Sequence, residues 1–127
     1  VSSLLQTLIR STYSNPPRHG AKLVTLILEN QNLRKIWEQE LLEMQKRIQV
    51  MREHLLRSLQ VSLGSTAFDF LKNRFGMFSF LGLSKQQVDE LAHNFGVYLT
   101  EDGRINLAAL NENNLQNVAT SIVKIVQ

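Results

Sequence analysis

Two arginines stand beside turn-forming residues at opposite ends of this 127-residue sequence. Arg10 opens the stretch Arg-Ser-Thr-Tyr-Ser-Asn-Pro-Pro-Arg-His-Gly at residues 10–20, and Arg104 follows Asp-Gly at residues 102–103. The only two prolines lie side by side at positions 16 and 17. Such a pair fixes two φ angles and removes two N–H donors. A segment stiffened in this way is typical of one that presents side chains to something outside itself.

Each of these signals also has a plainer interpretation. Arg104 after Asp-Gly is compatible with a solvated residue that opens a strand, and Arg10 with a residue that favours a helix C-terminus through the helix dipole. The small basic cluster Arg18, His19 and Lys22 is typical of a solvated helix start. The residues alone therefore leave the roles of the two arginines open.

Composition narrows the class of protein. The hydrophobic fraction of 43% is enough for a core in one domain of ordinary size. The net charge of +3 is consistent with anionic ligands but is too small to indicate a nucleic-acid partner. The absence of cysteine excludes disulfides and thiolate chemistry, and His54 and His93 lack metal-ligand partners at helical spacing, so we expect no metal site. No apolar run approaches the roughly 18 residues of a membrane span, so we expect no membrane partner.

The N-terminal half is expected to be helical. The pattern predicts a helix over residues 1–10, a loop over 11–16 and a second helix from Pro17 to residue 29. This second helix is apolar nearly all round, which by itself predicts that it is buried. The polar break at residues 29–32 contains an asparagine able to cap a long helix over residues 31–63, which Gly64 ends. One apolar stripe of that helix, expected to be core, contains Leu33, Trp37, Leu41, Met44, Ile48, Met51, Leu55 and Leu59. We expect part of this apolar surface, on helix 17–29 and on the long helix, to be exposed.

The C-terminal half predicts a mixture of short elements. We expect a short helix over residues 67–74, a strand over 77–81 and a helix over 85–95 capped by Ser84 and ended by Gly96. Asp-Gly between two short apolar runs predicts a hairpin with strands at 97–100 and 104–108. A last helix is expected over residues 112–126. The fold class is therefore α/β, mostly helical with a small sheet.

Blocks spread over the whole chain resemble the C-terminal part of aspartate aminotransferases, which are fold type I enzymes dependent on pyridoxal 5'-phosphate. The blocks are Tyr13-Ser14-Asn15-Pro16-Pro17, Leu33-Arg34-Lys35 with Trp37, Met51-Arg52, Gly76-Met77-Phe78, Tyr98-Leu99-Thr100 and Asp102-Gly103-Arg104-Ile105. The resemblance implies the end of a large domain at residues 1–30, including an inter-subunit loop at 10–17. It also implies a long connecting helix at 31–63 and a small α/β domain at 64–127. It implies that the chain is a fragment of a longer enzyme, in keeping with a start at Val1 inside a helix.

The resemblance also implies a role for each site residue. Arg104 matches the arginine that grips the substrate α-carboxylate, because a guanidinium fork holds both carboxylate oxygens at once. Arg10 matches the arginine that reaches the partner subunit's site in a homodimer and pairs with the distal carboxylate of the substrate. Ser14 and Asn15 are expected beside it at the subunit boundary, and Phe78 in the pocket wall.

Catalytic residues are not expected in this chain. The family holds its cofactor covalently on a lysine in a Ser-x-x-Lys type of motif, and no lysine here has that context. The resemblance implies a parent enzyme that transfers an amino group between L-aspartate and 2-oxoglutarate, while this stretch alone is expected to be inactive. Two alternatives stay open: an aromatic amino-acid aminotransferase, and a non-enzymatic helical module that self-associates along the stripe of the long helix. A cytoplasmic location is expected, with a mitochondrial one as the alternative.

Overall fold

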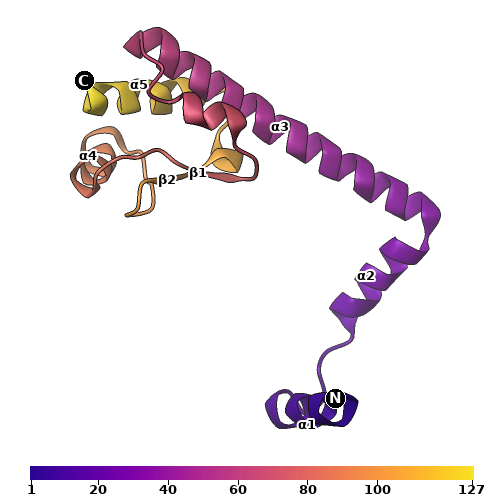
Figure 1. Ribbon diagram of the computed structural model, residues 1–127. Coiled ribbons are helices and arrows are strands. Elements are labelled where there is room, and N and C mark those ends of the chain that lie inside the picture. The colour runs from indigo at the N-terminus through magenta and orange to yellow at the C-terminus, as the bar shows by residue number, and fades with distance from the viewer. The chain divides into compact units, whose positions relative to one another are not determined.

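The computed structural model describes all residues from 1 to 127 (Figure 1). The elements follow in the order α1 (Ser2–Thr12), α2 (His19–Glu29), α3 (Gln31–Leu63), η1 (Asp69–Asn73), β1 (Phe78–Phe80), α4 (Lys85–Phe95), β2 (Arg104–Asn106), η2 (Leu107–Ala109) and α5 (Leu115–Val126). The chain divides into two compact units, Val1–Leu41 and Leu42–Gln127, with the boundary inside α3. The α/β class, mostly helical with a small sheet, is confirmed.

The first unit contains α1, α2 and the start of α3, and none of its side chains is buried. The second helix has no buried residue, so the burial predicted from its apolar pattern was wrong within this chain. The exposure expected of a fragment is found, since Leu23, Val24 and Leu26 are each about half exposed. The side chain of Asn30 accepts hydrogen bonds from the N–H groups of Asn32 and Leu33, at 3.0 and 3.1 Å, so Asn30 is the asparagine of the polar break that caps α3. The α1 helix continues two residues beyond its expected end, and α2 begins at His19 rather than at Pro17.

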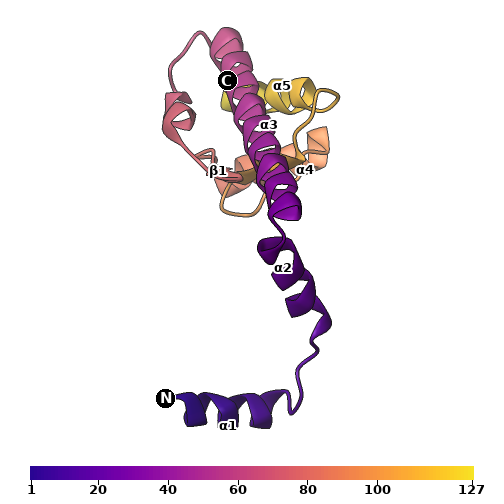
Figure 2. The same cartoon turned by 90° about the vertical axis from the view of Figure 1, so that its right-hand side faces the viewer.

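The second unit holds the hydrophobic core. Figure 2 shows α5, α4 and β1 gathered around the C-terminal half of α3. The core combines one face of α3 with α5 and the segments between them; its fully buried members are Leu55, Leu59, Leu71, Leu91, Leu107 and Ile122. The predicted stripe of α3 is therefore core only in its C-terminal half. Trp37 and Met44, expected as core, are exposed, because the buried core reaches α3 only from Met51 onward.

Two local end signals act as the sequence predicts. Ser84 and Gln87 form a capping box, in which each side chain accepts a hydrogen bond from the other residue's N–H, and α4 starts at Lys85. Gly96 ends α4 with a φ of 64°, and Gly64 follows α3 with a φ of 57°. Both values lie in the left-handed region that a residue with a Cβ enters at a cost.

The small sheet differs from the predicted hairpin. Residues 97–100 form no strand, and β2 pairs instead with β1 in an antiparallel register that places Phe80 opposite Arg104 and Ser79 opposite Ile105. The Asp-Gly turn is present, since the N–H of Gly103 donates to the carbonyl of Thr100 at 2.8 Å. The hairpin prediction was wrong because a turn signal fixes the turn alone, whereas the partner of a strand depends on long-range contacts.

Three other elements are shorter than predicted. The helix expected over 67–74 is the short η1, and the strand expected over 77–81 is β1. The strand expected over 104–108 ends at Asn106, and η2 follows from Leu107. The last helix starts at Leu115, because Asn111 and Asn114 first form a turn in which their side chains accept backbone hydrogen bonds. None of the helices is both long enough and apolar enough to cross a membrane.

Candidate functional site

Arg104 opens β2 directly after a tightly bonded turn. Its N–H donates to the hydroxyl of Thr100 at 3.2 Å and, at 3.3 Å, to the carboxylate of Asp102. The Thr100 hydroxyl also donates a hydrogen bond to that carboxylate. This bond, followed by the contacts with Arg104, lowers the pKa of Asp102. The turn therefore fixes the backbone from which the Arg104 side chain starts.

Gly103 lets this turn lie close to the neighbouring chain. Its φ is 74°, and a Cβ at this position would lie 3.2 Å from the carbonyl oxygen of Leu83. A residue with a side chain would meet both the left-handed backbone and this contact. The Asp-Gly pair is therefore required by the tertiary contact as well as by the turn.

The guanidinium of Arg104 lies over the ring of Phe78, with the Cζ atom 5.2 Å from the ring centroid. This arrangement is a cation–π contact. The Nε atom of Arg104 is buried and has no hydrogen-bond partner within the chain. No carboxylate of the chain forms an ion pair with this guanidinium. The arrangement is therefore suited to an anion that the chain itself does not supply.

Phe78 also lines a hollow of about 440 Å³ in the second unit. Its wall includes Phe70, Phe75, Phe80 and Arg74. An aromatic wall with arginine beside it is typical of a site that takes a partly apolar, negatively charged molecule. Phe78 therefore both lines this hollow and contacts the Arg104 guanidinium, whereas Arg104 itself is not part of the wall.

The remaining predicted residues lie together in the first unit. Arg10 is in the last turn of α1, and one of its terminal nitrogens lies 3.5 Å from the carbonyl oxygen of Ser14. Ser14 has a φ of 59°, a left-handed conformation that is uncommon for a residue other than glycine, and the N–H of Asn15 donates to the carbonyl of Tyr13 at 2.6 Å. Strained backbone of this kind occurs often at functional loops.

The sequence model of the family described as aminotransferase class I and II matches residues 1–122. The chain belongs to this family. Among the relatives of this aminotransferase chain, the aspartate aminotransferase of Escherichia coli (strain K12) is 44% identical over 124 residues, which are 98% of the chain and 31% of that protein. The aromatic-amino-acid aminotransferase of the same organism is 41% identical over 122 residues, which are 96% of the chain and 31% of that protein.

Solved structures agree with the sequence comparisons. The aromatic-amino-acid aminotransferase of Burkholderia pseudomallei, a structure with covalently bound pyridoxal phosphate, superposes with a TM-score of 0.94 at 43% identity. The match covers 98% of this chain and 31% of that one. The aminotransferase chain thus spans about a third of the length of the relatives that it matches.

Sequence reasoning missed the structural roles of two arginines of α3, of which only Arg52 contacts the segment that leads to Phe78. Arg52 is buried, and its guanidinium donates to the carbonyl oxygens of Arg74, at 2.6 Å, and Gly76. Arg47 donates to the carbonyl oxygens of Leu110, at 3.0 Å, and Ala108, at 2.8 Å. The available signal was the position of Arg52 four residues after Ile48 and four before Leu56, on the apolar side of the helix, where a charged residue needs partners.

Proposed function

We propose that this chain is part of a pyridoxal-phosphate-dependent transaminase that exchanges an amino group between L-aspartate and 2-oxoglutarate, and that Arg104 binds the substrate α-carboxylate. The observation that carries the proposal is the guanidinium of Arg104, which lies over Phe78 and forms no ion pair with a carboxylate of the chain. A fork of parallel N–H donors binds both oxygens of a carboxylate and so orients the amino acid. The names of the relatives supply the reaction and the amino-acid substrate, and the resemblance of the sequence implies 2-oxoglutarate as the acceptor.

Arg10 supplies the selection of dicarboxylic substrates in this proposal. It acts on the distal carboxylate of the substrate in the partner subunit's site of a homodimer, with Ser14 and Asn15 beside it. Two features support the assignment. The left-handed Ser14 holds the loop in an unusual conformation next to Arg10, and residues 10–17 are all exposed within the chain. The same proposal places residues 1–30 at the end of the large domain.

The cofactor is held by parts of the protein outside these residues. All lysines of the chain are exposed: Lys22, Lys35, Lys46, Lys72, Lys85 and Lys124. None lies in an enclosed site of the kind that a covalently bound pyridoxal phosphate requires, so the residues present do not fit this group by themselves. The chain's own contribution is to bind and orient carboxylates.

Aromatic amino-acid transamination is the second candidate, because relatives with that name are nearly as similar as those named for aspartate. The ratio of kcat/KM for aspartate to kcat/KM for phenylalanine, measured with the full-length enzyme, separates the two. Relatives are named both cytoplasmic and mitochondrial, and either compartment is compatible with the proposal. Self-association along the α3 stripe is disfavoured, because Met51, Leu55 and Leu59 are buried in the core of their own unit.

Replacement of Arg104 in the full-length enzyme tests the proposal. R104A is expected to lower kcat/KM for aspartate about 100-fold or more, because two charge-assisted hydrogen bonds contribute about 3 kcal/mol or more. R104K, which keeps the charge but not the fork, is expected to recover only part of the loss. The exposed Arg57→Ala serves as the control. An R104A enzyme with normal kcat and KM would overturn the assignment.

A further inference from the structure

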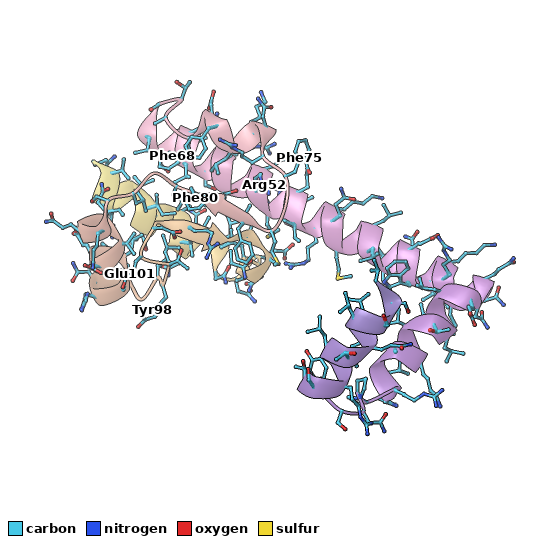
Figure 3. All side chains as sticks on the ribbon, turned by 60° about the horizontal axis from the view of Figure 1, so that its bottom comes forward. Arg52, Phe68, Phe75, Phe80, Tyr98 and Glu101 are labelled. Atoms are coloured by element: carbon cyan, nitrogen blue, oxygen red, sulfur yellow. The ribbon has the colours of Figure 1, made fainter.

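Arg52 is an arginine buried against the segment that leads into β1. Only 3% of its surface is exposed. Figure 3 shows it on α3 beside the segment that carries Phe75. Its two terminal nitrogens donate to the carbonyl oxygens of Arg74, at 2.6 Å, and Gly76. A rigid guanidinium that donates to two carbonyl oxygens two residues apart fixes the path of the backbone between them.

The segment that Arg52 holds has little else to fix it. Between the buried Leu71 and the buried Ser79, every residue is exposed within the chain, so no side chain anchors residues 72–78 to the core. Gly76 adds backbone flexibility to this segment, and its φ of 90° lies in a region that residues with a Cβ rarely adopt. The other backbone bonds lie at the two ends: the N–H of Arg74 donates to Leu71 at 3.3 Å, and the carbonyl of Met77 accepts from Leu107 at 2.8 Å.

Phe78 follows directly on this held segment. It lies two residues after Gly76, and its ring is the surface on which the Arg104 guanidinium rests, 5.2 Å from Cζ to centroid. A shift of the backbone at Gly76 therefore moves the support of the guanidinium. Because orientation of a substrate depends on placement to within about 1 Å, a small displacement here has a large effect on turnover.

We propose that Arg52 is a positioning residue that acts through Phe78 to hold Arg104 in the geometry that receives the substrate carboxylate. This inference rests on the proposed role of Arg104. Arg52 touches no substrate in this account. Its effect is carried from the guanidinium to the carbonyl of Gly76, from there to the start of β1, and across the sheet to the Arg104 side chain.

Arg47 provides a matched comparison on the same helix. It also donates from two nitrogens to two carbonyl oxygens, those of Ala108 and Leu110. The segment that it contacts is already anchored, because Leu107 and Leu110 are buried in the core on either side of Ala108. Loss of the Arg47 contacts therefore removes the same number of hydrogen bonds without freeing the chain near Phe78.

The test compares R52M with R47M in the full-length enzyme loaded with its cofactor. Methionine keeps an unbranched apolar stem and removes the donors. R52M is expected to lower kcat/KM roughly 10- to 100-fold. The loss should be equal for aspartate and for a monocarboxylic amino acid, because both carry the α-carboxylate. R47M should change kcat/KM less than about threefold. Thermal unfolding midpoints and the absorbance of the bound cofactor show whether both variants are folded. R52K, with one ammonium in place of the fork, should fall between wild type and R52M.

A double-mutant cycle that combines R52M with R104A separates the proposed role of Arg52 from that of Arg104. If Arg52 acts through Arg104, adding R52M to R104A lowers kcat/KM by less than about twofold, because the group that it positions is already gone. Additive losses, or equal losses in R52M and R47M, would overturn the positioning role while leaving that of Arg104 intact. A normal R104A enzyme would instead remove the proposed function itself. If R52M is not recovered folded, R52K decides, and wild-type kinetics in R52K would count against the inference.

Discussion

Phe80 and Arg104 lie directly opposite each other in the antiparallel pair formed by β1 and β2. Since side chains alternate between the faces of a strand pair, this register places Phe78, Phe80 and Arg104 on one face. The opposite face carries Ser79 and Ile105, which are both buried. The sheet is thus divided into a core face and a face on which aromatic rings accompany a guanidinium.

Phe78→Ala is expected to lower kcat/KM for aspartate about 3- to 30-fold, which corresponds to the loss of a cation–π contact worth about 0.5 to 2 kcal/mol. The reason is that the Arg104 guanidinium loses the ring over which it lies. Steady-state kinetics of the full-length enzyme measure the effect. Tyr98→Ala is the control, because Tyr98 is 81% exposed and its ring contacts no cation. Equal kinetics in the two variants would contradict the prediction.

Arg10→Ala is expected to reduce kcat/KM selectively for dicarboxylic amino acids. The loss for aspartate should be about 100-fold, the value of a charge-assisted pair at roughly 3 kcal/mol, while a monocarboxylic amino acid loses less than about twofold. Because both substrates are measured with the same preparation of the variant, differences in the concentration of active enzyme cancel from the ratio. Arg18→Ala, which changes a neighbouring exposed arginine, is the control. An equal loss for both substrates would show that Arg10 does not read the distal carboxylate.

Gly103→Ala is expected to destabilise the protein more than Gly64→Ala. Both glycines have a positive φ, of 74° and 57°, so both variants place alanine in the left-handed region at a cost of about 1 kcal/mol. Only at Gly103 would the new Cβ also meet a carbonyl oxygen, that of Leu83 at 3.2 Å; nothing lies within 4 Å at Gly64. Denaturant unfolding of both variants measures the difference, and equal losses would contradict the close approach.

Thr100→Val is expected to raise the pKa of Asp102 toward its ordinary value, because the hydrogen bond from the Thr100 hydroxyl is the main cause of the lowered pKa. Thr100→Ser keeps the hydroxyl and should keep the pKa low. Carboxyl chemical shifts followed against pH by NMR measure both. An unchanged pKa in the valine variant would show that another group holds the carboxylate.

The same pair predicts a pH dependence of stability. Because the pKa of Asp102 is lower in the folded chain than in the unfolded one, the carboxylate stabilises the fold at pH values above its unfolded pKa, which is about 3.9. This contribution is lost as the pH falls through the folded pKa. The stability gap between wild type and T100V should therefore be wider at neutral pH than at a pH below the folded pKa of Asp102, and a gap that is constant with pH would contradict the linkage.

Local signals in the sequence act over a few residues, and they were reliable here. Asn30 caps α3, Ser84 with Gln87 begins α4, and Gly64 and Gly96 end their helices as expected. Each of these signals works through a hydrogen bond or a φ angle within one turn of chain. The Asp-Gly turn before Arg104 is of the same kind and was also found in place.

The choice of strand partner was not available from the sequence. Two short apolar segments were candidate partners of β2. Residues 97–100 are close to it along the chain, and the turn signal favoured them, whereas β1 is more distant in sequence. The structure pairs β2 with β1, from the far side of α4, because Ile105 and Ser79 then share the buried face of the sheet. A pairing set by burial requires knowledge of which segments share the core.

The sequence by itself determined the family, most helix ends, and the two arginines with turn residues beside them, since each depends on residue types at short spacing. Only the tertiary structure decided that Arg104 rests on Phe78 and that Arg52 holds the chain before it. In the sequence Arg52 is one charge among many on a long helix. The two carbonyl oxygens that accept from its terminal nitrogens belong to a segment more than twenty residues away, which contacts it only in the folded chain.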